Sequence, residues 1–392
     1  MKKTALLLLC GALFLGACSK IEYREEPSKD ETLTGDMVDV SYFSTAARKV
    51  FVLNEGQMGS NNATLDFLRF PYGQYVTSSF KKMNPSVGAG LGDVGNDIAV
   101  VNQEVWIVVN NSGIVEVISA VDEIEKKAIS VPTPRNICFD DNYAYVTSWA
   151  GAFATGSYDE NWNYVITDSS NPKGQVYRIN LQTKQVEGSV EVGYQPEGIA
   201  CYDGKLHVAN SGGISSQLPP SYSYDNTVSI IDVASFTVTK TVEVQVNLKN
   251  VYSDGRGNIY VTTLGNFYDV HSGLYMITAD NPDRVLHVSD YVSFSAFCDG
   301  SVYCVGTESE FDWYAESHVY EAWTARYGIK NDLTLRLTET TPYSMAVIDP
   351  NTILIGDAGD YFNPGVVNCY WNGAKFWSVQ AGVCPGHYAI YK

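Results

Sequence analysis

Aromatic residues are concentrated in the long segments that separate the repeated strand patterns of this sequence. They are Trp149, Phe153, Tyr158, Trp162, Tyr164, Tyr222, Tyr224, Phe267, Tyr268, Phe311, Trp313, Tyr314, Tyr361 and Phe362. Tyr and Trp offer a large flat surface and one polar group, which suits planar rings and sugars. The alternative is that single rings pack the loops onto the strands below. For the whole set we favour a ligand-binding surface.

Polar side chains at the ends of the repeated patterns are candidates for the same surface. Arg135 and Asn250 lie where a repeat begins, and Asn111 and Asn210 lie where a strand ends. Amide and guanidinium groups can hydrogen-bond the amides or the phosphate of a ligand, and Arg135 is the only cation among these four. We therefore add them to the candidate ligand-binding residues.

The sequence predicts no catalytic residue, metal site or cofactor. Its five histidines lack metal-ligand spacing. His207 falls within a predicted strand, where we expect a structural role, whereas His271, His318 and His387 are expected in loops next to the aromatic residues. The acidic residues of those loops do not follow a calcium-loop pattern, and motifs of nucleotide-binding loops, serine hydrolases and zinc proteases are missing.

One phrase recurs along the chain: a short strand, a tight turn, and a second strand rich in aromatic residues and Val. Residues 96–100 with 105–110, 134–139 with 144–148, and 196–201 with 206–210 are three of its six complete copies. A second hairpin follows each copy. Four short strands in each unit, at intervals of roughly 40 to 60 residues, indicate the blades of a β-propeller.

The ends of the chain set the number of blades. Residues 49–54 match the second strand of the phrase with no first strand before them, and residues 385–391 match the first strand with no second strand after them. We therefore predict an all-β fold, a seven-bladed β-propeller with four-stranded blades over residues 49–392. The C-terminal strand completes the N-terminal blade, and this closure removes the free sheet edge.

The long links between the second and third strands of each blade emerge on one face, together with the links between blades. We call this the upper face. The links span residues 55–63, 111–113, 149–174, 211–226, 264–273, 307–319 and 358–365. Tight turns such as Asp203-Gly204, Asp299-Gly300 and Asn372-Gly373 belong to the opposite, lower face. Long loops on a rigid scaffold usually carry function, so we expect the ligand on the upper face.

The N-terminus predicts export and lipid anchoring. Residues 1–17 have the two lysines and the short apolar run of a signal peptide, and Leu15-Gly16-Ala17-Cys18 resembles the lipobox of bacterial lipoproteins. That resemblance implies lipidation of Cys18 and membrane contact through the lipid alone. Residues 21–31 are polar and rich in Glu, so we expect a flexible tether over residues 18–48. The formal charge of −18 argues against nucleic acid as a partner.

Six cysteines remain after residue 18, and we expect no disulfide among them. The turn at Asp299 staggers Cys298 and Cys304 by three residues, roughly 10 Å along the strands, which exceeds the reach of a disulfide. Cys138 and Cys201 are one position out of register on successive innermost strands, so we expect their side chains to point in opposite directions.

The Tyr-Val-Thr-like strands, the Pro-x-x-Ile start of several blades, and Val-Leu-Asn-Glu-Gly at residues 52–56 resemble the YVTN-type seven-bladed propellers. The combination with a lipobox is similar to the surface lipoproteins of the BtuG type. This resemblance implies a lipid-anchored protein of the outer membrane, exposed at the cell surface. Such a protein captures vitamin B12, a cobalamin, and passes it to a TonB-dependent transporter. No site residue is carried over from that family.

Two other functions stay open. A glycan-binding or scaffolding lipoprotein of a polysaccharide-uptake system would use aromatic platforms equally well. An enzyme, such as a propeller lyase, ranks third, because it needs a histidine or carboxylate pair at the mouth of the channel and the sequence shows none.

Overall fold

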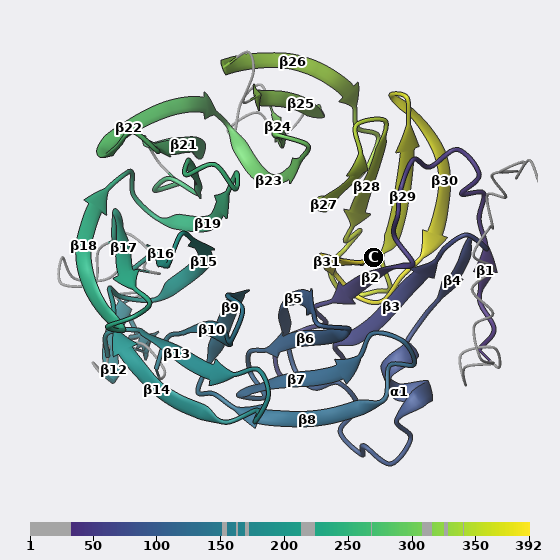
Figure 1. The fold of residues 1–392 in the computed structure, drawn as a ribbon, viewed down its shortest axis with the longest axis horizontal. Coiled ribbons are helices and arrows are strands. Elements are labelled where there is room, and N and C mark those ends of the chain that lie inside the picture. Colours follow the sequence, from purple (N-terminus) through teal and green to yellow (C-terminus); the bar gives the residue numbers. More distant parts are fainter. Residues whose placement is uncertain are drawn as a thin grey trace, which may run out of the picture.

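The computed structural model describes residues 33–150, 155–161, 164–168, 172–212, 224–267, 269–307, 316–324, 328–339 and 341–392. In this part of the chain, seven four-stranded antiparallel sheets stand around a central opening (Figure 1). The fold is a seven-bladed β-propeller, as the repeats predict. The predicted count of seven blades is confirmed.

The blades follow one another in chain order, and the strands of each blade lie from the innermost to the outermost in the order named. Blade 1 has β31 (Pro385–Tyr391), β2 (Lys49–Asn54), β3 (Thr64–Arg69) and β4 (Gln74–Val76), with β1 (Asp36–Met37) added outside. Blade 2 has β5 (Gly95–Val101), β6 (Glu104–Val109), β7 (Ile114–Ser119) and β8 (Glu125–Ser130). Blade 3 has β9 (Pro134–Phe139), β10 (Tyr143–Ser148), β13 (Gln175–Asn180) and β14 (Val186–Glu191).

The remaining four blades have the same plan. Blade 4 has β15 (Pro196–Tyr202), β16 (Lys205–Asn210), β17 (Thr227–Asp232) and β18 (Thr237–Glu243). Blade 5 has β19 (Leu248–Ser253), β20 (Ile259–Thr263), β21 (Gly273–Thr278) and β22 (Asn281–Asp290). Blade 6 has β23 (Val292–Cys298), β24 (Ser301–Thr307), β25 (Ser317–Thr324) and β26 (Gly328–Arg336). Blade 7 has β27 (Pro342–Asp349), β28 (Thr352–Asp357), β29 (Val366–Trp371) and β30 (Ala374–Gln380).

The C-terminal strand closes the ring. Strand β31 pairs antiparallel with β2, from Lys49 opposite Tyr391 to Asn54 opposite Pro385. The innermost strand of blade 1 therefore comes from the opposite end of the chain from its other strands. This pairing confirms the predicted closure and leaves no open blade at the junction of the two ends.

The apolar core lies in layers between neighbouring blades. Between blades 1 and 2, for example, Phe51 and Leu65 pack with Ile98 and Ile107, and all four side chains are buried. The second strand of each blade faces a neighbour on both sides, which explains why β2 is buried along its whole length. Because the layers radiate outward, the centre of the ring is left free for polar side chains.

Hairpin turns on the lower face have the predicted geometry. Both residues of Asp203-Gly204 have positive φ angles, 47° and 69°, and Asn372-Gly373 has 48° and 75°. Two successive positive φ angles are typical of the type I′ turn, which Asn-Gly and Asp-Gly favour. The short turns keep the lower face compact and leave insertions to the upper face.

The upper-face links begin and end within three residues of the predicted positions, and the largest difference is in the sixth link, which ends at residue 316 rather than 319. The link of blade 3 contains an additional hairpin, β11 (Thr155–Tyr158) with β12 (Tyr164–Asp168). A short helix that the sequence did not predict, α1 (Ser79–Met83), lies in the connection from blade 1 to blade 2. Among the described residues, no helix has the length and apolar character of a membrane span.

The segment before residue 49 differs from the predicted tether in its last part. Strand β1 pairs with β4, and the Trp377 indole donates a hydrogen bond to the Asp39 carbonyl over 3.0 Å. The Tyr42 ring lies 4.9 Å from Trp371, between ring centres. These contacts, together with the burial of Val40 and Ala47, hold residues 36–48 on the folded body beside the outer strands of blades 1 and 7.

The six cysteines of the described chain are free, including Cys369 and Cys384. Ser295 faces Cys304 and Cys298 faces Ser301, which is the predicted register. Cys138 and Cys201 both pack against one apolar cluster between blades 3 and 4. Their side chains leave opposite faces of their own blades, as expected, because the neighbours Phe139 and Ala200 pack toward blade 2 and blade 5.

Candidate binding site at the mouth of the central channel

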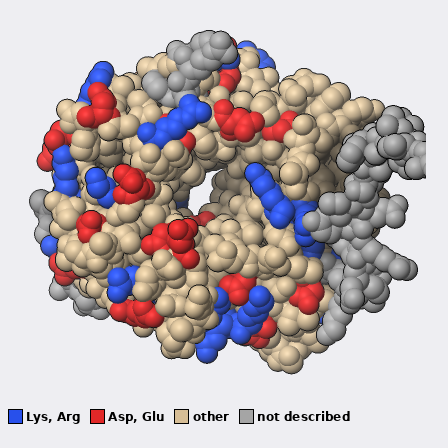
Figure 2. Space-filling model, viewed as in Figure 1, with Lys and Arg blue, Asp and Glu red and all other residues tan. Residues whose placement is uncertain are grey.

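A polar cavity of about 540 Å³ occupies the centre of the ring, where the described surface is open (Figure 2). All seven innermost strands contribute to its wall. The polar lining consists of Glu55, Asp97, Asn136, Lys249, Asn250, Tyr252, Ser293, Ser295, Tyr343, Ser344, His387 and Tyr388. This combination of amides, hydroxyls and charges can hydrogen-bond a polar ligand in several directions.

A bulge near the start of each innermost strand helps to form this lining. The pairing with the second strand shifts by a residue at Gly95/Asp97 in β5, at Leu248/Val251 in β19, and at the same level in the other five innermost strands of the described chain. A bulge redirects the side chains next to it. The second and third residues of several innermost strands, Lys249 and Asn250 among them, consequently lie at the cavity wall.

One side of the mouth carries a hydrogen-bonded group around Glu55. The Glu55 Oε1 atom lies 2.9 Å from His387 Nε2, and its Oε2 atom accepts a 2.6 Å hydrogen bond from the Tyr343 hydroxyl. Burial alone would raise the pKa of Glu55, but these two bonds and the charges of His387 and Lys249 hold the pKa below its ordinary value. Glu55 is therefore ionised at neutral pH.

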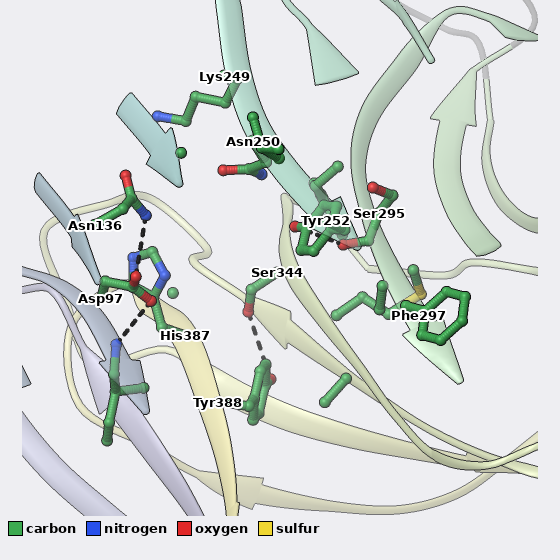
Figure 3. A pocket seen from close by; sticks show the side chains of 18 of the residues that line it. Asp97, Asn136, Lys249, Asn250, Tyr252, Ser295, Phe297, Ser344, His387 and Tyr388 are labelled. Atoms are coloured by element: carbon green, nitrogen blue, oxygen red, sulfur yellow. Dashed lines mark hydrogen bonds between the residues drawn. The ribbon is translucent and has the colours of Figure 1, made fainter. Parts of the chain in front are cut away.

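Asp97 lies next to this group and is enclosed by donors. Its oxygens accept hydrogen bonds from the backbone N–H of Ile98 at 2.8 Å, of Ile137 at 2.9 Å, and from the Asn136 amide at 3.2 Å (Figure 3). Burial raises the pKa of Asp97 despite these bonds and the charge of His387. The charge of His387 opposes that rise and also lowers the pKa of Glu55, so both carboxylates interact electrostatically with this imidazole.

The side of the mouth formed by β19 carries Lys249 and Asn250. Lys249 is half-buried, and its ammonium group has no hydrogen bond or ion pair with any described residue. Figure 3 shows its side chain extending along the mouth toward the side on which Asn136 lies. Asn250, one of the four polar residues predicted from the sequence, lines the same cavity.

Arg135, the cation that the sequence offered as a ligand-binding residue, forms an ion pair with a residue of the next blade. Its Nε and Nη2 atoms donate to Glu197 Oε2 over 3.1 and 3.0 Å, and the side chain is only 11% exposed. The Trp149 ring covers the guanidinium at 4.3 Å, a cation–π contact. The charge that the sequence offered to a ligand is thus neutralised by the neighbouring blade.

The two strand-end amides also have local partners. Asn210 is fully buried: its amide nitrogen donates to the hydroxyls of Thr227 and Ser229, and its carbonyl accepts from Gly193 N–H. Asn111 is exposed and donates to Asp93 over 2.6 Å. The first amide secures the link between strands, whereas the second remains accessible at the upper face.

Among the predicted aromatic residues that the structure describes, Tyr361 contacts the cavity wall, since its ring meets that of Tyr343 edge-on at 5.8 Å between centres. Phe362, on the link of blade 7, is 72% exposed, Phe267, on the link of blade 5, is 66% exposed, and Tyr224 is half-buried. Tyr158 and Tyr164 occupy paired backbone positions of β11 and β12. The remaining predicted rings, Phe153, Trp162, Tyr222, Tyr268, Phe311, Trp313 and Tyr314, lie outside the described residues.

Two histidines occupy strands rather than the predicted loops: His318 lies in β25 and His387 in β31. His271 is in the link before β21, as predicted, and its ring lies 4.8 Å from Tyr291. His207 is buried in β16, where burial lowers its pKa to about 4. In the described part of the chain, no three histidine, cysteine or acidic side chains gather as metal ligands do.

Sequence reasoning missed the residues that dominate the mouth: Glu55, Asp97, Asn136, Lys249, Tyr343 and His387. A signal for most of them exists in the repeats, because five of the six are the second or third residue of an innermost strand. Reading the same offset in every repeat would have assembled this ring of polar residues. Glu55 has no such signal, since it follows the second strand of its blade.

Comparison with known proteins supports the fold and nothing finer. No protein-family model matches the chain, and a search of curated proteins found no match. Among solved structures, hydrazine synthase of Kuenenia stuttgartiensis is similar, with a TM-score of 0.51 and 15% sequence identity over 70% of this chain and 76% of the other. At this identity, the likeness shows only that the two chains share a propeller fold.

Proposed function

We propose that this chain is a lipid-anchored protein of the bacterial cell surface that captures a corrinoid, vitamin B12 or a relative, and passes it to a TonB-dependent transporter of the outer membrane. The observation that carries the proposal is the polar cavity at the centre of the ring, with exposed aromatic residues on links at the same mouth. A corrinoid combines a broad flat macrocycle with a fringe of amide side chains, and this surface offers a partner for each part.

The described residues match that chemistry in two ways. Tyr361 and Phe362 present flat apolar surface at the rim, on which part of the macrocycle can rest. Inside the mouth, Asn136 and Asn250 supply amide groups that can pair with the amides of a ligand. The macrocycle would lie across the mouth while a peripheral group enters the cavity.

The resemblance of residues 15–18 to a lipobox supports the surface location, and the acidic charge of −18 supports anchoring by lipid rather than by contact with anionic headgroups. A folded body that begins near residue 36 leaves about eighteen residues between Cys18 and the propeller. That length permits the propeller to reach a transporter in the same membrane.

The proposal is tested by colour. The mature protein is mixed with cyanocobalamin and separated by gel filtration, and we expect the red ligand to elute with the protein. Asn250→Leu should release the ligand, whereas Lys205→Ala, an exposed change next to the lower-face turn, should retain it. A wild-type protein that elutes colourless contradicts corrinoid capture, and so does equal loss in both variants.

A glycan-binding role is the alternative, because the exposed rings at the rim also suit sugars. If wild type elutes without corrinoid but binds a polysaccharide in affinity electrophoresis, this role replaces the first one. Phe362→Ala should then weaken glycan binding while Lys205→Ala does not.

The contact of Glu55 with His387 favours an enzyme as a second candidate, since it is the histidine–carboxylate pair that a lyase needs at the channel mouth. A carboxylate that orients an imidazole leaves its other nitrogen available as a base. Incubation with acidic oligosaccharides, followed by ultraviolet absorption of the unsaturated product, tests this activity. Product formation that disappears in His387→Ala would make the chain an enzyme, whereas a flat trace in wild type would remove this candidate.

A further inference from the structure

Lys249 is the unusual charge of the channel mouth. The other described lysines in half-buried or buried positions meet a carboxylate: Lys49 lies 2.5 Å from Glu123, Lys184 lies 2.7 Å from Glu104, and Lys240 lies 2.6 Å from Asp283. Lys249 lines the cavity without such a partner among the described residues. Withdrawing an ammonium group partly from water costs free energy unless a counter-charge replaces the water. A bound ligand can provide that counter-charge.

Glu55 is the carboxylate whose charge interacts with Lys249, but it does not serve as the counter-charge of the Lys249 ammonium group. Its charge interacts with that of Lys249, because Lys249 contributes to the lowered pKa of Glu55, yet the two groups form no ion pair. Both oxygens of Glu55 are already bonded, to His387 and Tyr343. The two charges belong to β19 and to the link after β2, and these elements lie on different sides of the opening (Figure 1). The mouth is therefore positive at blade 5 and negative at blade 1.

The net charge of the chain and the paired Arg135 do not attract an anion to the mouth, so binding of an anion there depends on Lys249. The chain carries a formal charge of −18, so the molecule as a whole repels anions. At physiological salt that repulsion fades within about 8 Å, and a nearby cation then dominates. Arg135 cannot assist, because Glu197 neutralises it.

We infer that Lys249 binds an anionic group of the ligand, a phosphodiester or a carboxylate, at the blade 5 side of the channel mouth. This inference rests on the proposed function and names the group of the ligand that enters the cavity. In a corrinoid it is the phosphodiester of the nucleotide loop, and in an acidic glycan it is the carboxylate of a uronic acid. Asn250, adjacent on β19, lies on the same side of the wall.

Two corrinoids separate this inference from the proposed function. Cyanocobalamin contains the phosphodiester, whereas dicyanocobinamide lacks the nucleotide loop and its phosphate. Calorimetric titration of wild type, Lys249→Met and Lys249→Arg with both compounds is the experiment. We expect Lys249→Met to weaken cyanocobalamin binding roughly ten- to hundredfold, the range of a charge-assisted hydrogen bond. Dicyanocobinamide binding should change by less than about threefold, and Lys249→Arg should retain most of the affinity for both compounds.

The outcomes divide clearly. Equal weakening of both corrinoids by Lys249→Met, or no weakening of either, overturns the inference while corrinoid capture stands. If wild type binds neither corrinoid, the proposed function has failed, and the same three proteins are titrated with oligogalacturonate and with neutral oligogalactan. A selective loss of the acidic sugar in Lys249→Met then supports the anion site. Absence of that selectivity, or of any binding by wild type, overturns it.

Discussion

On blades 3 and 4, Arg135 and Glu197 contact each other and the Trp149 ring covers the guanidinium; on blades 5 and 1, Lys249 and Glu55 face the same channel without contact. Arg135, Glu197 and Lys249 are each the second residue of an innermost strand, whereas Glu55 follows the second strand of blade 1. The difference lies in what the adjacent blade presents. Where a neighbour supplies the counter-charge, the pair becomes part of the wall, and where it does not, the charge is left for a ligand.

The largest loss of stability is expected when the ion pair between Arg135 and Glu197 is broken. Glu197→Ala leaves the Arg135 guanidinium, 11% exposed, without its carboxylate, and should lower the free energy of unfolding by about 3 kcal/mol. Urea denaturation followed by circular dichroism measures this loss. The exposed Glu187→Ala on β14 of blade 3 serves as the control and should change stability by less than about 0.5 kcal/mol.

Replacing both partners sharpens the same point. Arg135→Met combined with Glu197→Leu should recover most of the loss, because apolar side chains of similar size need no counter-charge. A double variant as unstable as Glu197→Ala would show that packing, not charge, accounts for the first result.

A buried carboxyl group, that of Glu116, predicts that the stability of the fold depends on pH. Glu116 on β7 is buried near Glu125, and burial, with that neighbouring charge, raises its pKa to about 8 from an ordinary value of 4.5. A raised pKa in the folded state means that stability is complete below pH 4.5 and declines as pH rises toward 8. At about 1.4 kcal/mol for each pKa unit, the decline amounts to a few kcal/mol.

Glu116→Gln should remove this decline and make the protein more stable than wild type at pH 8, with little difference at pH 4.5. Thermal unfolding at both pH values measures it, with Glu187→Gln as the exposed control. Identical pH profiles for wild type and Glu116→Gln would show that Glu116 is not the group that titrates.

Trp149→Ala tests whether the Trp149 indole binds the ligand or only covers the Arg135 guanidinium. A covered aromatic anchor contributes about 2 kcal/mol to binding, so a ligand-binding Trp149 predicts affinity reduced by tens of fold. A ring that only covers Arg135 predicts a loss of stability near 1 kcal/mol with unchanged affinity. We expect both effects, because Trp149 is half-buried and keeps an exposed part. Calorimetry and thermal unfolding of the variant, beside Lys205→Ala, separate them, and unchanged affinity would assign Trp149 to the wall alone.

The smallest expected change is in the stability of Lys249→Met. Because no described residue pairs with Lys249, its removal should alter the free energy of unfolding by less than about 0.5 kcal/mol. Urea denaturation beside Glu197→Ala gives the direct comparison. A loss of stability similar to that of Glu197→Ala would mean that Lys249, like Arg135, has a structural role in the wall.

Much of the architecture was readable from the chain. The repeated phrase determined the strands, the unmatched strands at residues 49–54 and 385–391 determined the closure, and Asp-Gly and Asn-Gly determined the lower-face turns. These features follow from local rules, namely the alternation of side chains, the conformations that Gly and Asn permit, and the pairing of an incomplete sheet. The folded position of residues 36–48 was not readable, because it depends on Trp371 and Trp377 more than 300 positions away.

The sequence by itself determined that this protein is a closed ring of seven blades with its insertions on one face. Which charges remain open at the mouth was decided only by the tertiary structure. Arg135 and Lys249 occupy equivalent places in their repeats, and nothing local distinguishes them. The guanidinium finds Glu197 on the next blade and is neutralised, whereas the ammonium finds no carboxylate among the described residues. A charge is available to a ligand only when its neighbours in space leave it so, and in a propeller those neighbours come from different blades.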